Sequence, residues 1–434
     1  MRTRMPWWTT GLLTGALCAT LPTVSVAQSS DAPKPDGYTY YWPGACVQAV
    51  RRSHDYYWRA REDSAAWSPA VDTALSDEKK AARECATHFA NASLTTYDLI
   101  PLAQLYLITG DDATARTVVE RRLADPDVKD ASARAWALAQ IVDAYLSVSP
   151  KRPETALTYL SQLDALKGDE AAVGKVKAYL ALAEYYRDFG NDSAMVRASQ
   201  QVIASGKGLN SHDRNEFART LVLAYNYMAE AEADRTGDSV APLAVLGKAR
   251  ADIGSLMGVA GSLRELSAVY GLYGHPGARL VANAWIGAPG DTIHPVAGKP
   301  ALLNFIAYRW MFPAARRMAA EFGDKLDVAS VRPTIGYFKD LGPLNTTVEA
   351  GYLRTYFADD VHVAGAVAIT ETQFHRIPDG RRIPDPGPND RAYQTDAGSS
   401  FVVLDKNGVI RRIWLYWDRA YEPRLERSLK KYVQ

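Results

Sequence analysis

The sequence predicts an all-α array of helical hairpins followed by a smaller α/β domain. An apolar–turn–apolar unit recurs from about Ser76 to Tyr270, and such a repeat is typical of stacked helix pairs. Strand signals are concentrated after about Arg279, where they alternate with helical patterns. The 434 residues, 47% hydrophobic and 23% charged, are enough for two or three globular domains with substantial cores.

Residues 1–27 are predicted to be a secretory signal peptide. Arg2 and Arg4 form a positive start, residues 11–21 are mostly apolar, and Ser25-Val26-Ala27 offers a small-x-small cleavage site. The alternative, a short N-terminal membrane anchor, needs about 20 apolar residues. We therefore expect cleavage, a periplasmic or otherwise exported protein, and no stable membrane span afterwards.

The charge balance argues against a polyanionic partner. Removal of the leader takes away two arginines and no acids, so 50 − 2 = 48 basic residues face 49 acidic ones. A chain this balanced has no broad positive field for nucleic acid or anionic lipid, and we expect neither as a partner. Three arginine pairs are expected to lie on solvated faces: Arg316 and Arg317, Arg381 and Arg382, and Arg411 and Arg412.

The cysteines indicate a structural disulfide. Cys18 leaves with the leader, so the mature chain carries only Cys46 and Cys85, which are 39 positions apart. Two cysteines in an exported protein favour a disulfide, and a loop of that length would stabilise the fold by about 3–4 kcal/mol. The alternative is a redox-active pair, although distant cysteines lack the short spacing that tunes a thiolate.

Residues 28–75 are predicted to form an N-terminal cap with the first helices. After a polar, Pro-rich start, aromatic residues cluster over 38–42 and again over 56–58. We expect this segment to pack on the first helices of the array and to be tied down by Cys46. The alternative is an exposed aromatic platform that binds carbohydrate.

Four copies of the repeat fill residues 76–270. Each carries a tyrosine in its first apolar segment, at Tyr106, Tyr145, Tyr186 and Tyr227, so that successive copies are 39, 41 and 41 residues apart. Turn residues follow each tyrosine, as in Phe189-Gly190-Asn191-Asp192 of the third copy. A period near 40 with this order predicts stacked helical hairpins.

The first copy, LAQLYLITGDDATARTVVERRLADP, resembles a tetratricopeptide repeat (TPR) at its turn. There Gly110 would let two helices approach, and alanine follows on the facing helix. The spacing departs from that family's roughly 34 residues, so the array is TPR-like at most. The resemblance implies a concave surface for a peptide or protein; a helical layer that only packs against its neighbouring domain is the alternative.

A Gly-rich linker with a lead-in strand, 271–300, is predicted to precede an α/β domain over 301–434. The linker lacks the ordered strand, Gly-rich turn and helix of a nucleotide site. The domain is predicted to have the order β-α-β-α-β-β-β-α. Its strands are expected at 301–307, 326–331, 361–369, 401–404 and 409–417, its helices at 314–322, 347–357 and 422–432, and a Pro/Asp/Gly-rich loop at 377–392.

This last third resembles the exported bacterial thioredoxin-like proteins of the TlpA type. Residues 298–305, GKPALLNF, look like the family's Gly-Lys-x-x-Leu-x-Asn-Phe strand. Residues 401–408, FVVLDKNG, are similar to its late strand and Asp-x-x-Gly turn. The predicted fold class is therefore a TPR-like helical-hairpin array followed by an α/β thioredoxin-like domain.

The resemblance also shows which working residues are missing. The family's Trp-Cys-x-x-Cys would fall within residues 310–314, and its cis-proline near Ser399. The degenerate redox positions are Trp310, Met311, Phe312, Pro313, Ala314 and Ser399. Because the thiolate is the nucleophile of dithiol exchange, the inherited reaction cannot run there.

No other chemistry is indicated in the domain. His362 and His375 match no metal motif, and most of the nearby acids lie in the Pro-rich loop. We therefore expect no catalytic residue, metal or cofactor. Trp310 to Phe312 could instead form an exposed contact surface or pack on the array.

The sequence favours an exported, non-catalytic protein-binding or scaffold module. The alternative from the enzyme class is a divergent thiol–disulfide oxidoreductase or antioxidant protein that uses Cys46 and Cys85. A periplasmic carbohydrate-associated protein is a third possibility, suggested by 24 Tyr and 10 Trp.

Overall fold

The computed structural model describes residues 42–48, 50, 68–90, 92–286, 298–305, 312–334, 345–358, 365–370, 374–376, 382–384, 387–395, 400–415 and 422–433. Every described residue belongs to one compact unit, Tyr40–Gln434. The predicted signal peptide and most of the predicted aromatic cap lie outside the described residues. None of the described helices is both long and apolar enough to cross a membrane.

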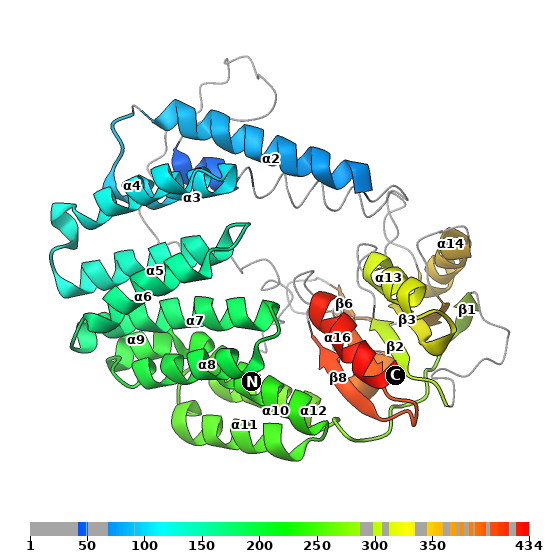
Figure 1. Cartoon of the computed structure of the whole chain (residues 1–434). Coiled ribbons are helices and arrows are strands. Elements are labelled where there is room, and N and C mark those ends of the chain that lie inside the picture. The colour runs from blue at the N-terminus through cyan, green and yellow to red at the C-terminus, as the bar shows by residue number, and fades with distance from the viewer. Residues whose placement is uncertain are drawn as a thin grey trace. The chain divides into compact units, whose positions relative to one another are not determined.

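The first part of the described chain, the helical array, consists of helices paired across short turns (Figure 1). Its helices are α2 (Ser68–Phe89), α3 (Leu99–Thr109), α4 (Asp112–Leu123), α5 (Ala131–Ser147), α6 (Pro153–Ala165), α7 (Ala172–Asp188), α8 (Asp192–Gly206), α9 (Ser211–Glu216), α10 (Ala218–Thr236), α11 (Val240–Ile253) and α12 (Val259–Tyr270). The four marker tyrosines fall on α3, α5, α7 and α10, and each predicted turn separates that helix from the next one. The predicted hairpins are therefore present.

Turn chemistry explains where these helices end. Gly110 and Gly237 end α3 and α10 in the left-handed region, at φ of 86° and 69°, where glycine carries no Cβ penalty. Asp111 and Asn191 then cap α4 and α8, because each side chain accepts a hydrogen bond from the backbone N–H three residues on.

The second part, the α/β region, is built on a mixed six-stranded sheet of order β1-β4-β3-β2-β7-β8. β2, β3 and β4 are parallel, whereas β7 runs antiparallel to β2, β8 to β7 and β1 to β4. Its elements are β1 (Ala284–Ile286), β2 (Ala301–Phe305), α13 (Phe312–Phe322), β3 (Asp327–Pro333), α14 (Thr346–Ala358), β4 (Ala366–Thr370), β5 (Phe374–Arg376), β6 (Arg382–Pro384), α15 (Pro388–Tyr393), β7 (Ser400–Leu404), β8 (Ile410–Trp414) and α16 (Glu422–Val433).

The predicted order of the longer elements of this region is confirmed, but β5, β6 and α15 were not predicted. The stretch 377–392, expected as a loop, contains β6 and α15. Asp390, expected among loop acids, is buried, and its carboxylate accepts hydrogen bonds from Gly387 N (3.2 Å) and Thr395 Oγ1 (2.9 Å). The loop was predicted from the content of proline, aspartate and glycine. Proline is also compatible with the first position of a helix, so composition alone did not distinguish this short helix from a loop.

The two faces of the sheet contribute to different cores. Leu303 lies in the same core as Tyr270 of the array. Leu302, on the opposite face of β2, packs in a second core with Met318 of α13 and Leu425 of α16. The array and the sheet thus share one apolar core, while α13 and α16 cover the other face.

Residues 274–286 complete both edges of the sheet. Near one edge, Gly274 N donates to Ile410 O of β8 at 2.9 Å. At the other, Asn283 N donates to Ile369 O of β4 at 2.9 Å, and β1 continues that pairing. The described part of the predicted linker, up to Ile286, is therefore hydrogen-bonded to β8 and to β4, and it covers those two strand edges.

Polar groups of α15 hold the middle of this segment. Asn389 donates to Val281 O at 2.7 Å and accepts from Val281 N at 2.9 Å. Tyr393, itself fully buried, donates its hydroxyl hydrogen to Ala278 O. Burial raises the pKa of the Tyr393 hydroxyl, so it remains a donor at neutral pH.

Two glycines test how closely the array helices pack. On α7, a Cβ at Gly174 would lie 2.5 Å from Ala135 O of α5, whereas a Cβ at Gly247 on α11 would meet nothing within 4 Å. We expect Gly174→Ala to lower the free energy of unfolding by about 1–3 kcal/mol through overpacking. Gly247→Ala should raise it by about 0.5–1 kcal/mol through helix propensity. Urea denaturation measures both, and equal effects would contradict the close approach of α5 and α7.

Candidate binding surface at the α7–α8 turn

A buried ion cluster joins the array to the α/β region. Its centre is Glu230 of α10, which is 4% exposed. Glu230 accepts hydrogen bonds from Arg187 Nε of α7 at 2.9 Å and from Arg412 of β8. Arg424 of α16 lies 3.4 Å from Glu230 Oε1. We use the name ion cluster for these residues and the two aspartates that pair with them: Arg187, Asp192, Glu230, Asp234, Arg412 and Arg424.

Arg412 corrects the expectation that its arginine pair is solvated. The side chain is 1% exposed and pairs with Glu230 and Asp234, while its neighbour Arg411 is half-buried and pairs with Asp405. In a strand, alternate residues share a face, so Arg412 lies with Trp414, whose ring is 4.8 Å from the guanidinium carbon. Arg411 shares the other face with Ile413, so alternation in the sequence does not by itself separate the two arginines.

The charges of the ion cluster are matched, three arginines against three acids. Burial alone would raise the pKa of Glu230, but the guanidinium groups of Arg187, Arg424 and Arg412 outweigh it and lower the pKa from 4.5 to about 2. Burial lowers the pKa of Arg412 to about 10, with Glu230 opposing, so this guanidinium is also charged at neutral pH. The cluster therefore ties α7, α8, α10, β8 and α16 together as ions.

This arrangement predicts acid sensitivity. Because the pKa of Glu230 is lower in the folded chain than the 4.5 of a free side chain, its stabilisation is complete above that pH and is lost as the pH falls through about 2. The difference corresponds to about 3 kcal/mol. We expect Glu230→Gln to flatten the dependence of the free energy of unfolding on pH between these values, measured by urea denaturation at several pH values. An unchanged slope in the variant would show that other carboxylates cause the pH dependence of the free energy of unfolding.

Beside the ion cluster, the end of α7 carries an aromatic cluster of half-buried Tyr185 and Tyr186 and exposed Phe189. The ring of Tyr185 lies 4.7 Å from that of Phe189 and 5.3 Å from that of Tyr186. Lys151 Nζ is 5.6 Å from the Phe189 ring and forms an ion pair of 2.8 Å with Asp188. The Phe189 side chain is nevertheless 59% exposed, which is unusual for a large aromatic residue.

Helix α16 reaches the turn that carries Phe189. Arg424 Nη1 donates to Arg187 O at 3.1 Å, next to the aromatic residues. Gly190 follows Phe189 with φ of 70°, and a Cβ there would overlap the guanidinium of Arg427. Glycine at this position therefore serves both the left-handed turn and the close approach of Arg427.

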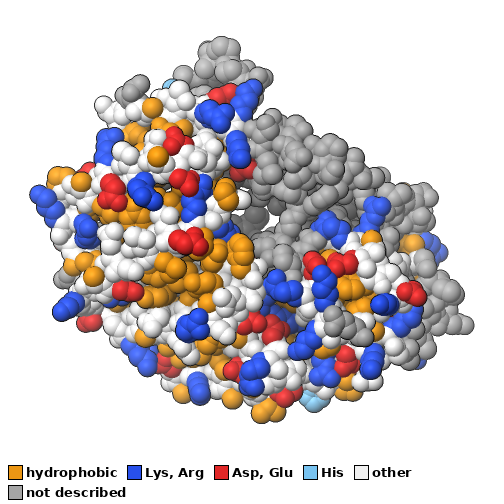
Figure 2. Space-filling view, viewed as in Figure 1, with side chains coloured by type: hydrophobic (Ala, Val, Ile, Leu, Met, Phe, Trp, Pro, Cys, Tyr) orange, Lys and Arg blue, Asp and Glu red, His pale blue; other side chains and the backbone are white. Residues whose placement is uncertain are grey.

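Figure 2 shows one face of the molecule. Hydrophobic side chains gather over the array helices, and Lys, Arg, Asp and Glu side chains are mixed among them on the face in view. An exposed phenylalanine beside half-buried tyrosines and charged side chains is typical of protein contact surfaces.

Most of the degenerate redox positions cannot be placed relative to the surface at the α7–α8 turn. Trp310, Met311 and Ser399 lie outside the described residues, as do the side chains of Phe312 and Pro313, which begin α13. Ala314 is buried in the core between α13 and the sheet. A contact surface at Trp310 to Phe312 thus stays a prediction.

Two neighbouring strands of the sheet each carry a buried polar side chain. Asn304 of β2 and Ser330 of β3 are paired in register, fully buried, and their side chains have no hydrogen-bond partner among the described residues. Both are closed off from solvent, so they cannot contact a ligand without a rearrangement.

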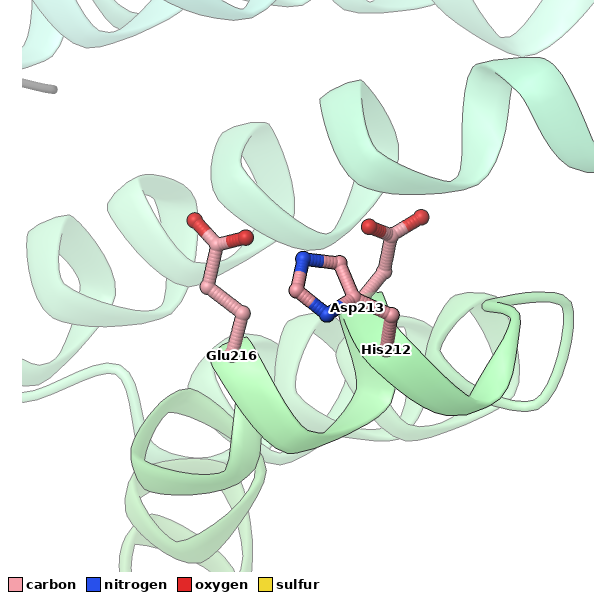
Figure 3. Close-up of side chains that lie close together, drawn as sticks. All are labelled: His212, Asp213 and Glu216. Carbon is pink, nitrogen blue, oxygen red and sulfur yellow. The ribbon is translucent and has the colours of Figure 1, made fainter.

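Three residues of α9 have the composition of a metal site. Figure 3 shows His212, Asp213 and Glu216 projecting from one short turn, and their ligand atoms lie within 4.8 Å of one another. However, the Asp213 carboxylate already accepts a hydrogen bond from Asn210 Nδ2 at 2.6 Å, and Glu216 interacts with the cation of Lys177. We assign no metal centre to these residues.

The predicted disulfide between Cys46 and Cys85 is present. Their Cα atoms are 6.3 Å apart, and the two residues are only 2% and 1% exposed. Cys85 lies on α2 and Cys46 in the short helical segment before it, so the bond ties the start of the described chain to the array. Neither sulfur is placed for attack by an external thiolate.

Comparison with known proteins leaves the family open. Neither the models of known protein families nor the curated protein sequences gave a match. Among solved structures, the chain is similar to the crystal structure of a thioredoxin-like superfamily protein. The identity is 16% and the TM-score 0.27, over 36% of this chain and 96% of that chain. A likeness of this size establishes neither family nor activity, so the function is argued from the geometry above.

Proposed function

We propose that this chain is an exported, non-catalytic protein-binding or scaffold module, in which a TPR-like array carries a thioredoxin-like domain. One observation supports binding most directly: Phe189 of the aromatic cluster is exposed at a turn that the ion cluster holds in place. Rigid, exposed aromatic anchors beside charged groups are what protein interfaces use, because they bury a large area at little entropic cost. The export signal and the domain boundaries at residues 270 and 300 belong to this proposal as well.

Position-specific cross-linking tests the proposed binding. A photoreactive phenylalanine analogue would replace Phe189 in the exported full-length protein, and in a control it would replace Met257, which is 81% exposed on the α11–α12 turn. We expect a discrete cross-linked product from position 189 in the exported compartment and none from position 257. Equal labelling from both positions, or none from either, would contradict a binding surface at the α7–α8 turn.

The enzyme alternative, a thiol–disulfide oxidoreductase, depends on Cys46 and Cys85. Catalysis of exchange requires that a thiolate of the enzyme and a sulfur of the partner meet. The burial of both cysteines argues for a structural role instead.

A further inference from the structure

We propose that the aromatic cluster and Arg427 together bind a partner segment in which a carboxylate lies next to an apolar side chain. This inference rests on the proposed protein-binding function and names the chemistry of the partner. It follows from an imbalance of charge at the seam between the α7–α8 turn and α16.

Arg427 is the cation that the ion cluster does not neutralise. The two acids whose charges act on it are already engaged: Asp192 with Arg424 at 3.2 Å, and Glu426 with Lys430. No ion pair or hydrogen bond joins the Arg427 guanidinium to another side chain in the described part of the chain. Its planar fork matches a carboxylate with two parallel hydrogen bonds.

Surrounding protein makes this charge less well solvated than a free arginine. Burial lowers the pKa of Arg427, and the neighbouring cation of Arg424 lowers it further. An incoming negative charge would offset both effects, because it favours the charged form of the guanidinium. A basic partner would be repelled, because it would add a third cation beside Arg424 and Arg427.

The apolar half of the site is adjacent to the charged half. Gly190 follows Phe189 in the chain, and the guanidinium of Arg427 lies against Gly190. The residue that carries the exposed ring is thus next to the residue that the cation contacts. Lys151 and Asp188, paired at 2.8 Å, border the rings and compensate one another. A segment that places an apolar side chain on Phe189 can therefore bring its carboxylate to Arg427.

Short peptides of defined charge test this chemistry on the full-length protein. The probe is fluorescein-labelled Gly-Asp-Phe-Asp-Phe-Gly with a blocked C-terminus, followed by fluorescence anisotropy. Matched probes carry lysine or asparagine in place of aspartate. We expect the aspartate probe to bind best, and its affinity to fall at least about fivefold in Arg427→Gln and about tenfold in Phe189→Ala.

Two further variants separate recognition from general charge. Arg264→Gln removes an exposed arginine from α12 and should leave the affinity unchanged, while Arg427→Lys should recover only part of it, because lysine keeps the charge without the fork. Circular dichroism confirms that each variant is folded. Equal binding of the three probes, no binding of any, or an unchanged affinity in Arg427→Gln would each overturn the proposal.

Failure here differs from failure of the proposed function. If position 189 still cross-links to a partner while the aspartate probe does not bind, the surface binds protein but not through a carboxylate. If neither occurs, the surface is not a binding site.

Discussion

Replacing Arg412 with methionine is expected to lower the free energy of unfolding by about 3–5 kcal/mol. The change leaves the carboxylates of Glu230 and Asp234 without one of their partners, and Glu230 is too deeply buried to be solvated by water instead. Removing one member of a buried charge network costs more than the network contributes, because the remaining charge is uncompensated. Urea denaturation followed by circular dichroism measures the loss.

A surface ion pair on α10, the helix that carries Glu230 and Asp234, provides the control. Arg235 pairs with Glu232 on α10, but its side chain is 67% exposed. Arg235→Met should therefore change the free energy of unfolding by less than about 1 kcal/mol. If Arg412→Met were as mild as Arg235→Met, the ion cluster would not be what holds the array to the α/β region.

Hydrogen exchange can show where the loss of Arg412 acts. Because the cluster joins α10 to β8 and α16, we expect amide protection in both the array and the α/β region to fall together. Loss of protection in β8 alone would indicate that the cluster stabilises only its own strand.

The double variant Cys46→Ser, Cys85→Ser is expected to lose about 3–4 kcal/mol, since the bond closes a loop of 39 residues. Adding a reductant to the unaltered protein should produce a loss of similar size, whereas the same reductant should not affect the double variant. A negligible loss would mean that packing around these residues, not the bond, orders the start of the array.

The same variant discriminates between the two functions in an insulin reduction assay. We expect no activity in either protein, because both sulfurs are buried. Activity in the unaltered protein that disappears in the double variant would replace the scaffold proposal with the oxidoreductase.

Local signals in the sequence explain most of the fold. The turns at Gly110 and at 189–192 were visible because glycine and capping residues mark helix ends wherever they occur. The strand at 301–305 and the hairpin around Asp405 to Gly408 were visible because apolar runs bounded by turn residues have few alternatives. The short helix α15 was missed, since proline and aspartate are also typical of loops.

Only part of the candidate site could be predicted from the sequence. Phe189 and Gly190 were identified as a break between helices, which is correct for the backbone but says nothing of what the turn contacts. Arg412 and Arg424 are 182 and 194 positions beyond Glu230, and no periodicity links residues so far apart. The contact positions around Trp310 that the sequence suggested lie outside the described residues.

By itself, the sequence determined the helical hairpins, the order of elements in the α/β region and the pairing of two cysteines, because each depends on local pattern or on simple counting. The tertiary structure alone decided that Arg412 is buried while Arg411 is not, that the linker pairs with both edges of the sheet, and that Arg427 lies against the turn of Phe189. The physical reason is that a buried charge stabilises or destabilises the fold according to the groups packed against it. Which groups those are depends on the packing of segments that are distant in the sequence.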